Sequence, residues 1–270
     1  MSVALDFTAP LFVPANRPER FAKAASSGAD AIILDLEDAV PADAKGEARG
    51  LLRADFSDCP IMVRINAIGT AWHLDDVAAV SRLGFSGIMI PKAERPEDIA
   101  AIAEAVGPGR FVVPLIETAR GMERSRALAG VPGVGRLAFG SIDYCADLGC
   151  AHTRTALLAA RSELVLASRL AGLSPPADGV TTSIHDLALI TDDARHAREV
   201  GFGSKLCIHP AQIDPVRRGF APDEAEIAWA EKVAASGDGA SAVDGNMVDE
   251  PVRQRARSIL ARAAALRKAP

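Results

Sequence analysis

Short apolar runs recur along this chain, and longer segments with apolar residues at helical spacing separate them. The run 112–118 is rich in β-branched residues and closes on Glu117, so it predicts a buried parallel strand. Thr118 is placed to cap a helix that follows that strand. Similar runs predict further strands at 11–15, 31–37, 60–66, 87–92, 136–143, 178–184 and 205–209. The other helices are predicted at 17–27, 42–53, 70–83, 96–106, 155–171 (after a loop at 144–152) and 186–200.

Eight strand–helix units follow one another at a spacing of roughly 20 to 35 residues, which predicts an α/β fold of the TIM (β/α)8 barrel type. The alternative is a doubly wound open sheet, which normally has a glycine-rich turn after its first strand. Segment 13–18 is not such a turn.

The pattern divides the chain into a barrel domain at 1–220 and a C-terminal helical extension at 221–270. The extension is predicted to contain two helices, at 222–235 and 251–268. The Gly, Ser and Asp residues of 236–241 between them indicate a flexible link. We interpret the extension as a lid or as an arm that contacts a partner.

Composition argues against several classes of function. The 270 residues are 49% hydrophobic but only 4% aromatic, which indicates one large aliphatic core. A net charge of -5 gives no electrostatic reason to expect nucleic acid. We expect no signal peptide, because residues 1–12 lack a basic region followed by an apolar core, and no membrane span, because no apolar run approaches about 20 residues. The four cysteines form no Cys-x-x-Cys pair, so we expect a reduced, cytoplasmic protein.

Polar side chains gather at the predicted ends of the strands, where the active site of such a barrel lies. They are Asn16, Asp35, Glu37, Asp38, Arg64, Asn66, Lys92, Glu117, Ser141, Asp143 and His209. Barrel mouths are polar in any case, so one such residue taken alone says little. The whole set, with two acids closing otherwise apolar runs, favours a functional site.

Glu117 and Asp143 are the strongest candidates for metal binding. They are 26 positions apart, about one strand–helix–strand repeat, so the acids should converge at the ends of adjacent strands. Carboxylate oxygens without nearby Cys or His favour Mg²⁺ or Mn²⁺ over Zn²⁺. Such a metal would polarise a substrate carbonyl and stabilise an enolate.

The other charged residues each have a functional and a structural interpretation. Arg64 suits a substrate carboxylate, and its structural alternative is an ion pair with Asp35 or Glu37. The acids at 35, 37 and 38 could support metal-bound water. Lys92 could form a Schiff base, although a salt bridge suits its acidic surroundings better. His209 could be a base, but a structural role is the commoner one.

Six segments together resemble the citrate lyase beta subunit-like family, the CoA-ester lyase branch of the HpcH/HpaI aldolase superfamily. These segments are 11–21, 33–40, 63–66, 114–118, 140–143 and 208–212. The resemblance implies a TIM barrel, often trimeric, that binds Mg²⁺ and an acyl-CoA. Such enzymes cleave or form thioesters such as malyl-CoA, citramalyl-CoA or citryl derivatives.

The resemblance also implies roles for particular residues. The metal ligands of the family fall on Glu117 and Asp143, and its substrate arginine falls on Arg64. Phe12 and Lys23 match positions that contact CoA. The motif at 140–143 adds Gly140 and Ser141 to the residues expected to bind substrate.

The tail matches as well, because segment 244–251 resembles the C-terminal lid motif of the family. By that resemblance Asp249 enters the active site of a neighbouring subunit and acts as acid/base at the thioester enolate. From the sequence alone, Asp249 just ahead of Pro251 is more simply a helix N-cap.

We therefore expect a stand-alone, homo-oligomeric (trimeric or hexameric) Mg²⁺-dependent lyase. It would cleave a 3-hydroxyacyl-CoA to an acyl-CoA and a 2-oxo acid. One alternative is an aldolase that cleaves free 4-hydroxy-2-oxo acids, against which the Asp249 tail argues. Another is a non-catalytic subunit that carries a partner or an acyl carrier, against which the intact charged residues argue.

Overall fold

The computed structural model describes residues 5, 7–237 and 241–268, and in it eight parallel strands are hydrogen-bonded in chain order. Leu11 bridges Cys207, and the Phe12 N–H donates to the Cys207 carbonyl, so the last segment meets the first and the barrel closes. This confirms the TIM barrel and excludes the open sheet. The strands are β1 Leu11–Pro14, β2 Ile32–Asp35, β3 Ile61–Arg64, β4 Gly87–Ile90, β5 Phe111–Ile116, β6 Ala138–Phe139, β7 Ala177–Asp178 and β8 Ser204–Lys205.

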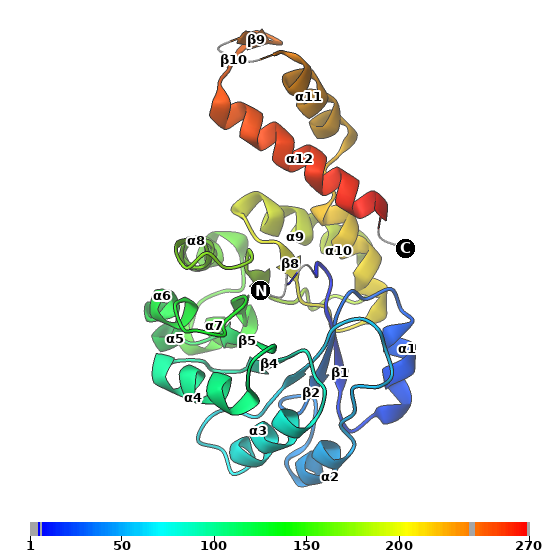
Figure 1. The fold of residues 1–270 in the computed structure, drawn as a ribbon, viewed down its shortest axis with the longest axis vertical. Helices are drawn as coiled ribbons and strands as arrows, with labels where there is room; N and C mark the ends of the chain where they lie inside the picture. Colours follow the sequence, from blue (N-terminus) through cyan, green and yellow to red (C-terminus); the bar gives the residue numbers. More distant parts are fainter. Residues whose placement is uncertain (1–4, 6, 238–240, 269–270) are drawn as a thin grey trace.

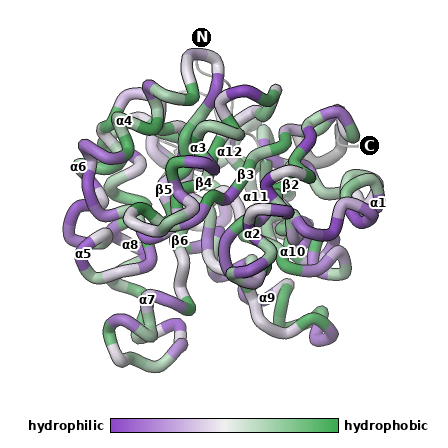
Figure 2. The backbone as a smooth tube through the Cα atoms, turned by 90° about the horizontal axis from the view of Figure 1, so that it is seen from below, coloured by the Kyte–Doolittle hydropathy of each residue, from purple (hydrophilic) through white to green (hydrophobic). Residues whose placement is uncertain are grey.

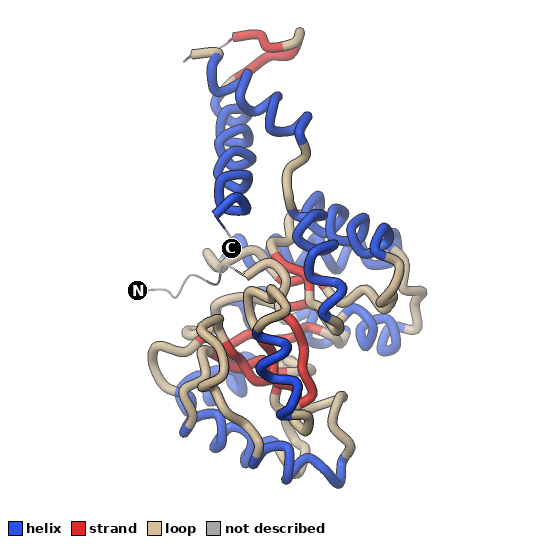
Figure 3. The backbone as a smooth tube through the Cα atoms, turned by 90° about the vertical axis from the view of Figure 1, so that its right-hand side faces the viewer, coloured by secondary structure: helices blue, strands red, loops and turns tan. Residues whose placement is uncertain are grey.

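Helices surround this sheet, which lies at the centre of Figures 1 and 3. Local signals start them as expected: the Thr118 hydroxyl, for example, accepts from the Gly121 N–H at the start of α5. The α-helices of the barrel are α1 Phe21–Ala25, α2 Lys45–Gly50, α3 His73–Arg82, α4 Pro96–Val106, α5 Ala119–Glu123, α6 Ser125–Ala129, α7 Ser141–Leu148, α8 Arg154–Leu170, α9 Leu187–Val200 and α10 Ile213–Phe220. Short 3₁₀ turns are η1 Pro18–Arg20, η2 Ala42–Ala44 and η3 Pro210–Gln212.

Alternation along the strands builds two hydrophobic layers. Ile32 and Leu34 of β2 pack outward against the helices, whereas Ile33 points into the barrel interior. Leu5 and Phe7, which precede β1, join that interior cluster. In Figure 2 the hydrophobic stretches concentrate along the central strands, and hydrophilic ones mark many of the outer turns.

Three sequence predictions at the later strands were wrong in extent. The run 136–143 splits into β6 and α7, because Gly140 ends the strand and serves as the N-cap of the helix. The predicted loop 144–152 is therefore partly helical. The last two runs form only the two-residue strands β7 and β8, and their remaining residues turn away toward the barrel mouth.

After α10 the chain forms a separate hydrophobic cluster, which we call the C-terminal unit. It consists of α11 Glu224–Ala235, the hairpin β9 Ser241–Val243 and β10 Asn246–Val248, and α12 Glu250–Lys268. Ala230, Val248 and Ile259 are buried in its core. Figure 1 shows it projecting from the barrel with the hairpin at its far tip. Part of the predicted link, 238–240, lies outside the described residues.

The two helices of the C-terminal unit pack on each other, so α12 is not a free arm relative to α11. Asp223 forms a capping box with Glu226 at the start of α11. None of the helices described over 5, 7–237 and 241–268 has the length and apolarity needed to cross a membrane.

Candidate active site

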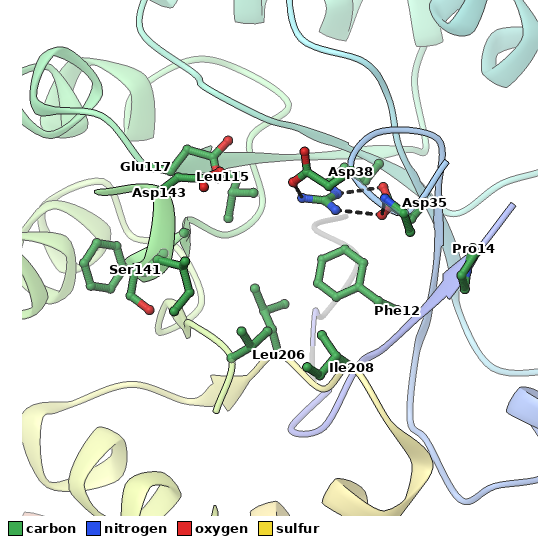
Figure 4. Close-up of a pocket in the computed structure, with 16 residues that line it drawn as sticks. Phe12, Pro14, Asp35, Asp38, Leu115, Glu117, Ser141, Asp143, Leu206 and Ile208 are labelled. Atoms are coloured by element: carbon green, nitrogen blue, oxygen red, sulfur yellow. Dashed lines mark hydrogen bonds and ion pairs between the residues drawn. The ribbon is translucent and has the colours of Figure 1, made fainter. Parts of the chain in front are cut away.

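A cavity of about 400 Å³ opens at the barrel mouth, where the strands end. Figure 4 shows Glu117 and Asp143 on one side of it, Asp35 on the other, and Phe12 between them. Its walls are therefore charged on two sides and apolar on the third. The lining residues are Phe12, Pro14, Asp35, Asp38, Ala39, Arg64, Leu115, Glu117, Phe139, Gly140, Ser141, Ile142, Asp143, Val180, Leu206 and Ile208.

Glu117 directly follows β5, and its shortest contact is with backbone. The Lys92 N–H donates to its Oε1 at 2.7 Å. Lys92 has a φ of 48°, in the left-handed region that non-glycine residues seldom occupy. A Cβ on residue 140 would overlap the Glu117 carboxylate, so only glycine fits at Gly140. These restraints fix the carboxylate at the mouth.

Asp143 reaches the same point from the first turn of α7 rather than from a strand end. The Lys92 ammonium lies 3.9 Å from both the Glu117 and the Asp143 carboxylates. It lies closer, at 2.7 Å, to Glu37 Oε1. The expected convergence of the two acids is therefore present, and Lys92 takes the salt-bridge role that its surroundings favoured.

Arg64 ends β3 and is surrounded by acids. Its Nε and Nη2 donate to the two oxygens of Asp35 at 2.8 and 2.7 Å. Its Nη1 lies 2.8 Å from Glu37 and 3.3 Å from Asp38, and its guanidinium carbon lies 4.8 Å from the centre of the Phe12 ring. The ion pairs expected as the structural alternative are all present. The contact with Asp38 is the longest, and that side chain is 61% exposed.

The acids of the mouth outnumber its cations, which affects their ionisation. Burial, with the nearby Glu37 charge adding to it, raises the pKa of Glu117 to about 8 despite Lys92. Burial also raises the pKa of Glu37, although Arg64 and Lys92 oppose the change. Burial acts to lower the pKa of Arg64, but the charges of Asp35 and Glu37 outweigh it and raise that pKa. The Glu117 side of the mouth is short of positive charge.

The donor set at the mouth fits Mg²⁺. Within the described residues, no three His, Cys, Asp or Glu side chains converge as a full ligand set. Mg²⁺ typically needs only one or two carboxylates, because water and substrate oxygens complete its octahedron. Glu117 and Asp143 supply two, and the side chain of Asp143, which lines the cavity, is 43% exposed.

Several predicted residues lie elsewhere. Lys23 is exposed on α1 and is not among the residues that line the mouth. The Asn66 amide donates to the buried Asp76, and His209 accepts from the Ala211 N–H as the cap of η3. Asp249 caps α12, with its carboxylate accepting from the Val252 N–H at 3.2 Å.

Sequence reasoning missed the apolar wall formed by Val180, Leu206 and Ile208. The alternation of β8 and its continuation carries the signal, because residues 206 and 208 share one face. The prediction of a strand over 205–209 did not assign its two faces, so it left this signal unused. Ser141 is at the cavity, and its hydroxyl is hydrogen-bonded to His152 at 2.9 Å, a partner that the sequence did not indicate.

Comparison with known proteins adds to this geometry. The model of the family described as HpcH/HpaI aldolase/citrate lyase matches residues 9–210. A citrate lyase subunit beta-like protein of Mycobacterium tuberculosis is 40% identical over 94% of each chain. A (3S)-malyl-CoA thioesterase of Cereibacter sphaeroides is 34% identical, over 96% of this chain and 95% of its own. The human mitochondrial citramalyl-CoA lyase is 30% identical, over 96% of this chain and 86% of its own.

Solved structures agree. CitE of Mycobacterium tuberculosis in complex with magnesium, acetoacetate and coenzyme A superposes with a TM-score of 0.87 at 38% identity, over 96% of this chain and 99% of that one. The citrate lyase beta subunit from M. tuberculosis with oxaloacetate and magnesium gives 0.71 at 37% identity, over 82% of this chain and 100% of that one.

Proposed function

Because this chain belongs to the HpcH/HpaI aldolase/citrate lyase family, we propose that it is a Mg²⁺-dependent carbon–carbon lyase of 3-hydroxyacyl-CoA thioesters. It would release an acyl-CoA and a 2-oxo acid, or join them in reverse. The observation that carries the proposal is the mouth cavity, which combines Glu117 and Asp143 with Arg64 around a partly apolar space. A lyase and a thioesterase of CoA esters among the relatives support it.

Glu117 and Asp143 are the residues that would hold the Mg²⁺, with Mn²⁺ as a substitute. When bound, the ion would polarise the substrate oxygens and stabilise the negative charge that develops on them. Glu37 lies beside this position and would orient ion-bound water, as would Asp35 and Asp38 across the mouth.

Arg64 would bind the substrate carboxylate, and its surroundings suggest how. Asp35 fixes the guanidinium through a bidentate pair, so the group is oriented before substrate arrives. The contact with Asp38 is long and exposed, so a substrate carboxylate can replace it at Nη1. Substrate binding would then exchange one carboxylate for another instead of leaving a buried acid unpaired.

The thioester end would lie along the apolar wall of Phe12, Leu206 and Ile208. Ile208 is 42% exposed, which marks the side on which the cavity opens to solvent. The long CoA chain would leave by this side. Lys23 is exposed on α1, outside the cavity, where a phosphate of CoA could meet it beyond the reacting atoms.

The acid/base at the thioester enolate would be Asp249 from a neighbouring copy of the chain. In a (β/α)8 barrel a helix runs back from the mouth, so the end of α10 at Phe220 lies at the opposite end of the barrel. The C-terminal unit departs from there. Asp249 directly follows β10 of the hairpin, and Figure 1 shows that hairpin at the far tip of the unit. A tip so placed suits the mouth of another subunit better than its own.

A shared site requires a homo-oligomer, for which we propose a trimer or hexamer. We also propose a cytoplasmic location, which the four free cysteines support. On this proposal the barrel at 1–220 binds metal and substrate, and the extension at 221–270 completes a neighbouring site.

The test is a panel of malyl-, citramalyl- and citryl-CoA incubated with the protein and Mg²⁺, with products followed by mass spectrometry. A lyase yields acetyl-CoA and a 2-oxo acid, both dependent on Mg²⁺. Free CoA with an intact hydroxy acid would make the protein a thioesterase instead. Cleavage of free 4-hydroxy-2-oxo acids alone would make it a CoA-independent aldolase, and no turnover of any of them would favour a non-catalytic subunit.

A mixing experiment tests the shared site. Asp249→Ala should nearly abolish turnover while sparing Mg²⁺ binding, and Asp249→Ser, which keeps an N-cap, separates capping from chemistry. Mixed oligomers of Asp249→Ala and Glu117→Gln subunits should recover activity, because some neighbours combine an intact mouth with an intact tail. No recovery in verified mixed oligomers would refute the shared site.

A further inference from the structure

A second cavity, of about 820 Å³, lies at the end of the barrel opposite the mouth. Its walls include residues that precede strands, such as Asp30 before β2, Pro175 before β7 and Gly203 before β8. Ser258, Ala261 and Arg262 of α12 form its other side. The cavity therefore lies between the barrel and the C-terminal unit, away from all residues assigned to catalysis.

This cavity is strongly basic. Among the described residues that line it, the charged ones are Asp30 and four arginines, namely Arg136, Arg198, Arg217 and Arg262. They come from four separate parts of the chain, which are the β6 approach, α9, α10 and α12. The mouth of the barrel has the opposite balance, with acids in excess.

Two of the arginines have clear structural partners. Arg136 is buried and donates to the carbonyls of Phe7 and Leu5. Arg198 donates to the Ala221 carbonyl and pairs with Glu226 at 2.8 Å, which ties α9 to the C-terminal unit. Packing and chain connection account for both of them.

Arg217 and Arg262 differ from that pair. Arg217 lies 3.8 Å from Asp30, and the two oxygens of that carboxylate already accept from the Thr8 and Ala9 N–H groups. The Arg217 side chain donates no hydrogen bond to any residue that the structure describes, although it is only 25% exposed. Arg262 has no acid within 4 Å in the described part of the chain, and it lies on the C-terminal unit facing the same cavity.

We propose that this cavity binds the phosphate group of a small phosphorylated molecule, with Arg217 and Arg262 as its principal ligands. Guanidinium forks on different elements suit a tetrahedral dianion, which accepts from several directions at once. The volume is that of a small-molecule site. Phe202, Phe220 and Pro175 give apolar surface for the organic part.

A bound phosphate would link α10 of the barrel to α12 of the C-terminal unit. It would thereby fix the unit that carries Asp249, and this consequence for turnover rests on the proposed function. Binding itself does not rest on it, because neither Arg217 nor Arg262 belongs to the mouth. A failure of the lyase assay would therefore leave the binding test unaffected.

The experiment is calorimetric titration of the metal-free full-length protein with inorganic pyrophosphate at low ionic strength, where charge interactions are least screened. We expect saturable binding with a Kd below about 1 mM in the wild type. Arg217→Gln with Arg262→Gln should weaken it at least about tenfold, because two charge-assisted contacts are lost. Bound pyrophosphate should also raise the Tm of the wild type and not that of the double variant.

Arg255→Gln is the matched control, since Arg255 is on the same helix but stacks on Trp229 outside this cavity. It should bind pyrophosphate like the wild type. If the double variant fails to fold, Arg262→Gln alone serves, because the exposed Arg262 has no ion pair with a described residue. Absence of saturable binding up to 10 mM (about tenfold above the expected limit), undiminished binding in the variants, or an equal loss in Arg255→Gln would each overturn the proposal.

Discussion

Two charge clusters at the strand ends of one barrel differ in how their charges balance. In the first, Asp178 of β7 lies 2.9 Å from Arg161 of α8 and 3.1 Å from Lys205 of β8, and all three side chains are at most 7% exposed. The second is the mouth, where five acids surround the two cations Arg64 and Lys92. Its members range from buried to 61% exposed.

The ionisation of one acid in each cluster shows what this difference means. Burial by itself raises the pKa of Asp178, but Lys205 and Arg161 outweigh it, so the pKa is lowered. At Glu117 burial raises the pKa to about 8, and the Glu37 charge adds to this rise, whereas Lys92 opposes it. In the first cluster two buried cations hold a single acid, whereas in the second five acids share two cations. A structural role follows for one and a cation-binding role for the other.

The largest expected effect is at the mouth. Glu117→Gln or Asp143→Asn should lower Mg²⁺-dependent turnover by about 10³-fold or more, because each removes a ligand of an ion worth several kcal/mol to the transition state. Steady-state kinetics measure the loss, and circular dichroism should show an unchanged fold. Wild-type turnover in both variants would place the metal elsewhere.

A substitution in the cluster of Asp178, Arg161 and Lys205 should lower the stability of the fold rather than turnover. Asp178→Asn leaves Arg161 and Lys205 buried without a counterion, which should cost about 3–5 kcal/mol of the free energy of unfolding. Urea denaturation measures it. Glu163→Gln, which breaks the exposed pair with Arg126, is the control and should cost less than about 1 kcal/mol. Equal costs for the two variants would contradict the distinction between the clusters.

Arg64 combines a structural and a functional role, because it forms ion pairs within the protein and would also bind the substrate carboxylate. Arg64→Lys should lower kcat/KM by roughly 30-fold, or about 2 kcal/mol, since a point charge cannot replace the fork. Asp38→Asn leaves the bidentate pair with Asp35 intact and should change kcat/KM much less. A larger loss from Asp38→Asn than from Arg64→Lys would reverse the proposed exchange of carboxylates.

The smallest effect is a change in how stability depends on pH. Because the folded pKa of Asp178 lies below its unfolded value near 3.9, the ionised group stabilises the fold above that pH. This contribution is lost as the pH falls from about 4 through the folded pKa. The unfolding free energy of the wild type should therefore fall more steeply below pH 4 than that of Asp178→Asn. Parallel curves would mean that Asp178 is not held ionised by its partners.

The fold and part of the site could be predicted from the sequence. Repeated strand–helix units predicted the barrel, and the apolar run before Glu117 predicted β5 with its terminal acid. Asp143 lies close to Glu117, as predicted. It lies in the first turn of α7 and not at the end of a strand, because Gly140 ends β6 and begins that helix. Apolar runs give no signal for where a strand stops when a helix begins within the same run.

Other features depend on contacts between distant residues, which a single sequence does not encode visibly. The left-handed backbone of Lys92 accompanies the hydrogen bond from its N–H to Glu117, which is 25 positions away in the chain. The packing of α11 on α12 was hidden by the polar segment between them. The basic cavity brings together Arg217 and Arg262, which are 45 positions apart in the chain.

Calorimetric titration of Mg²⁺ into the metal-free protein, compared among the wild type, Glu117→Gln and Glu163→Gln, tests the metal site most directly. We expect one ion bound per chain in the wild type and in Glu163→Gln. We expect no saturable binding in Glu117→Gln, in which the mouth has lost one of its two carboxylate ligands. Equal Mg²⁺ affinity in all three proteins would contradict the claim that the acid-rich mouth is the metal site.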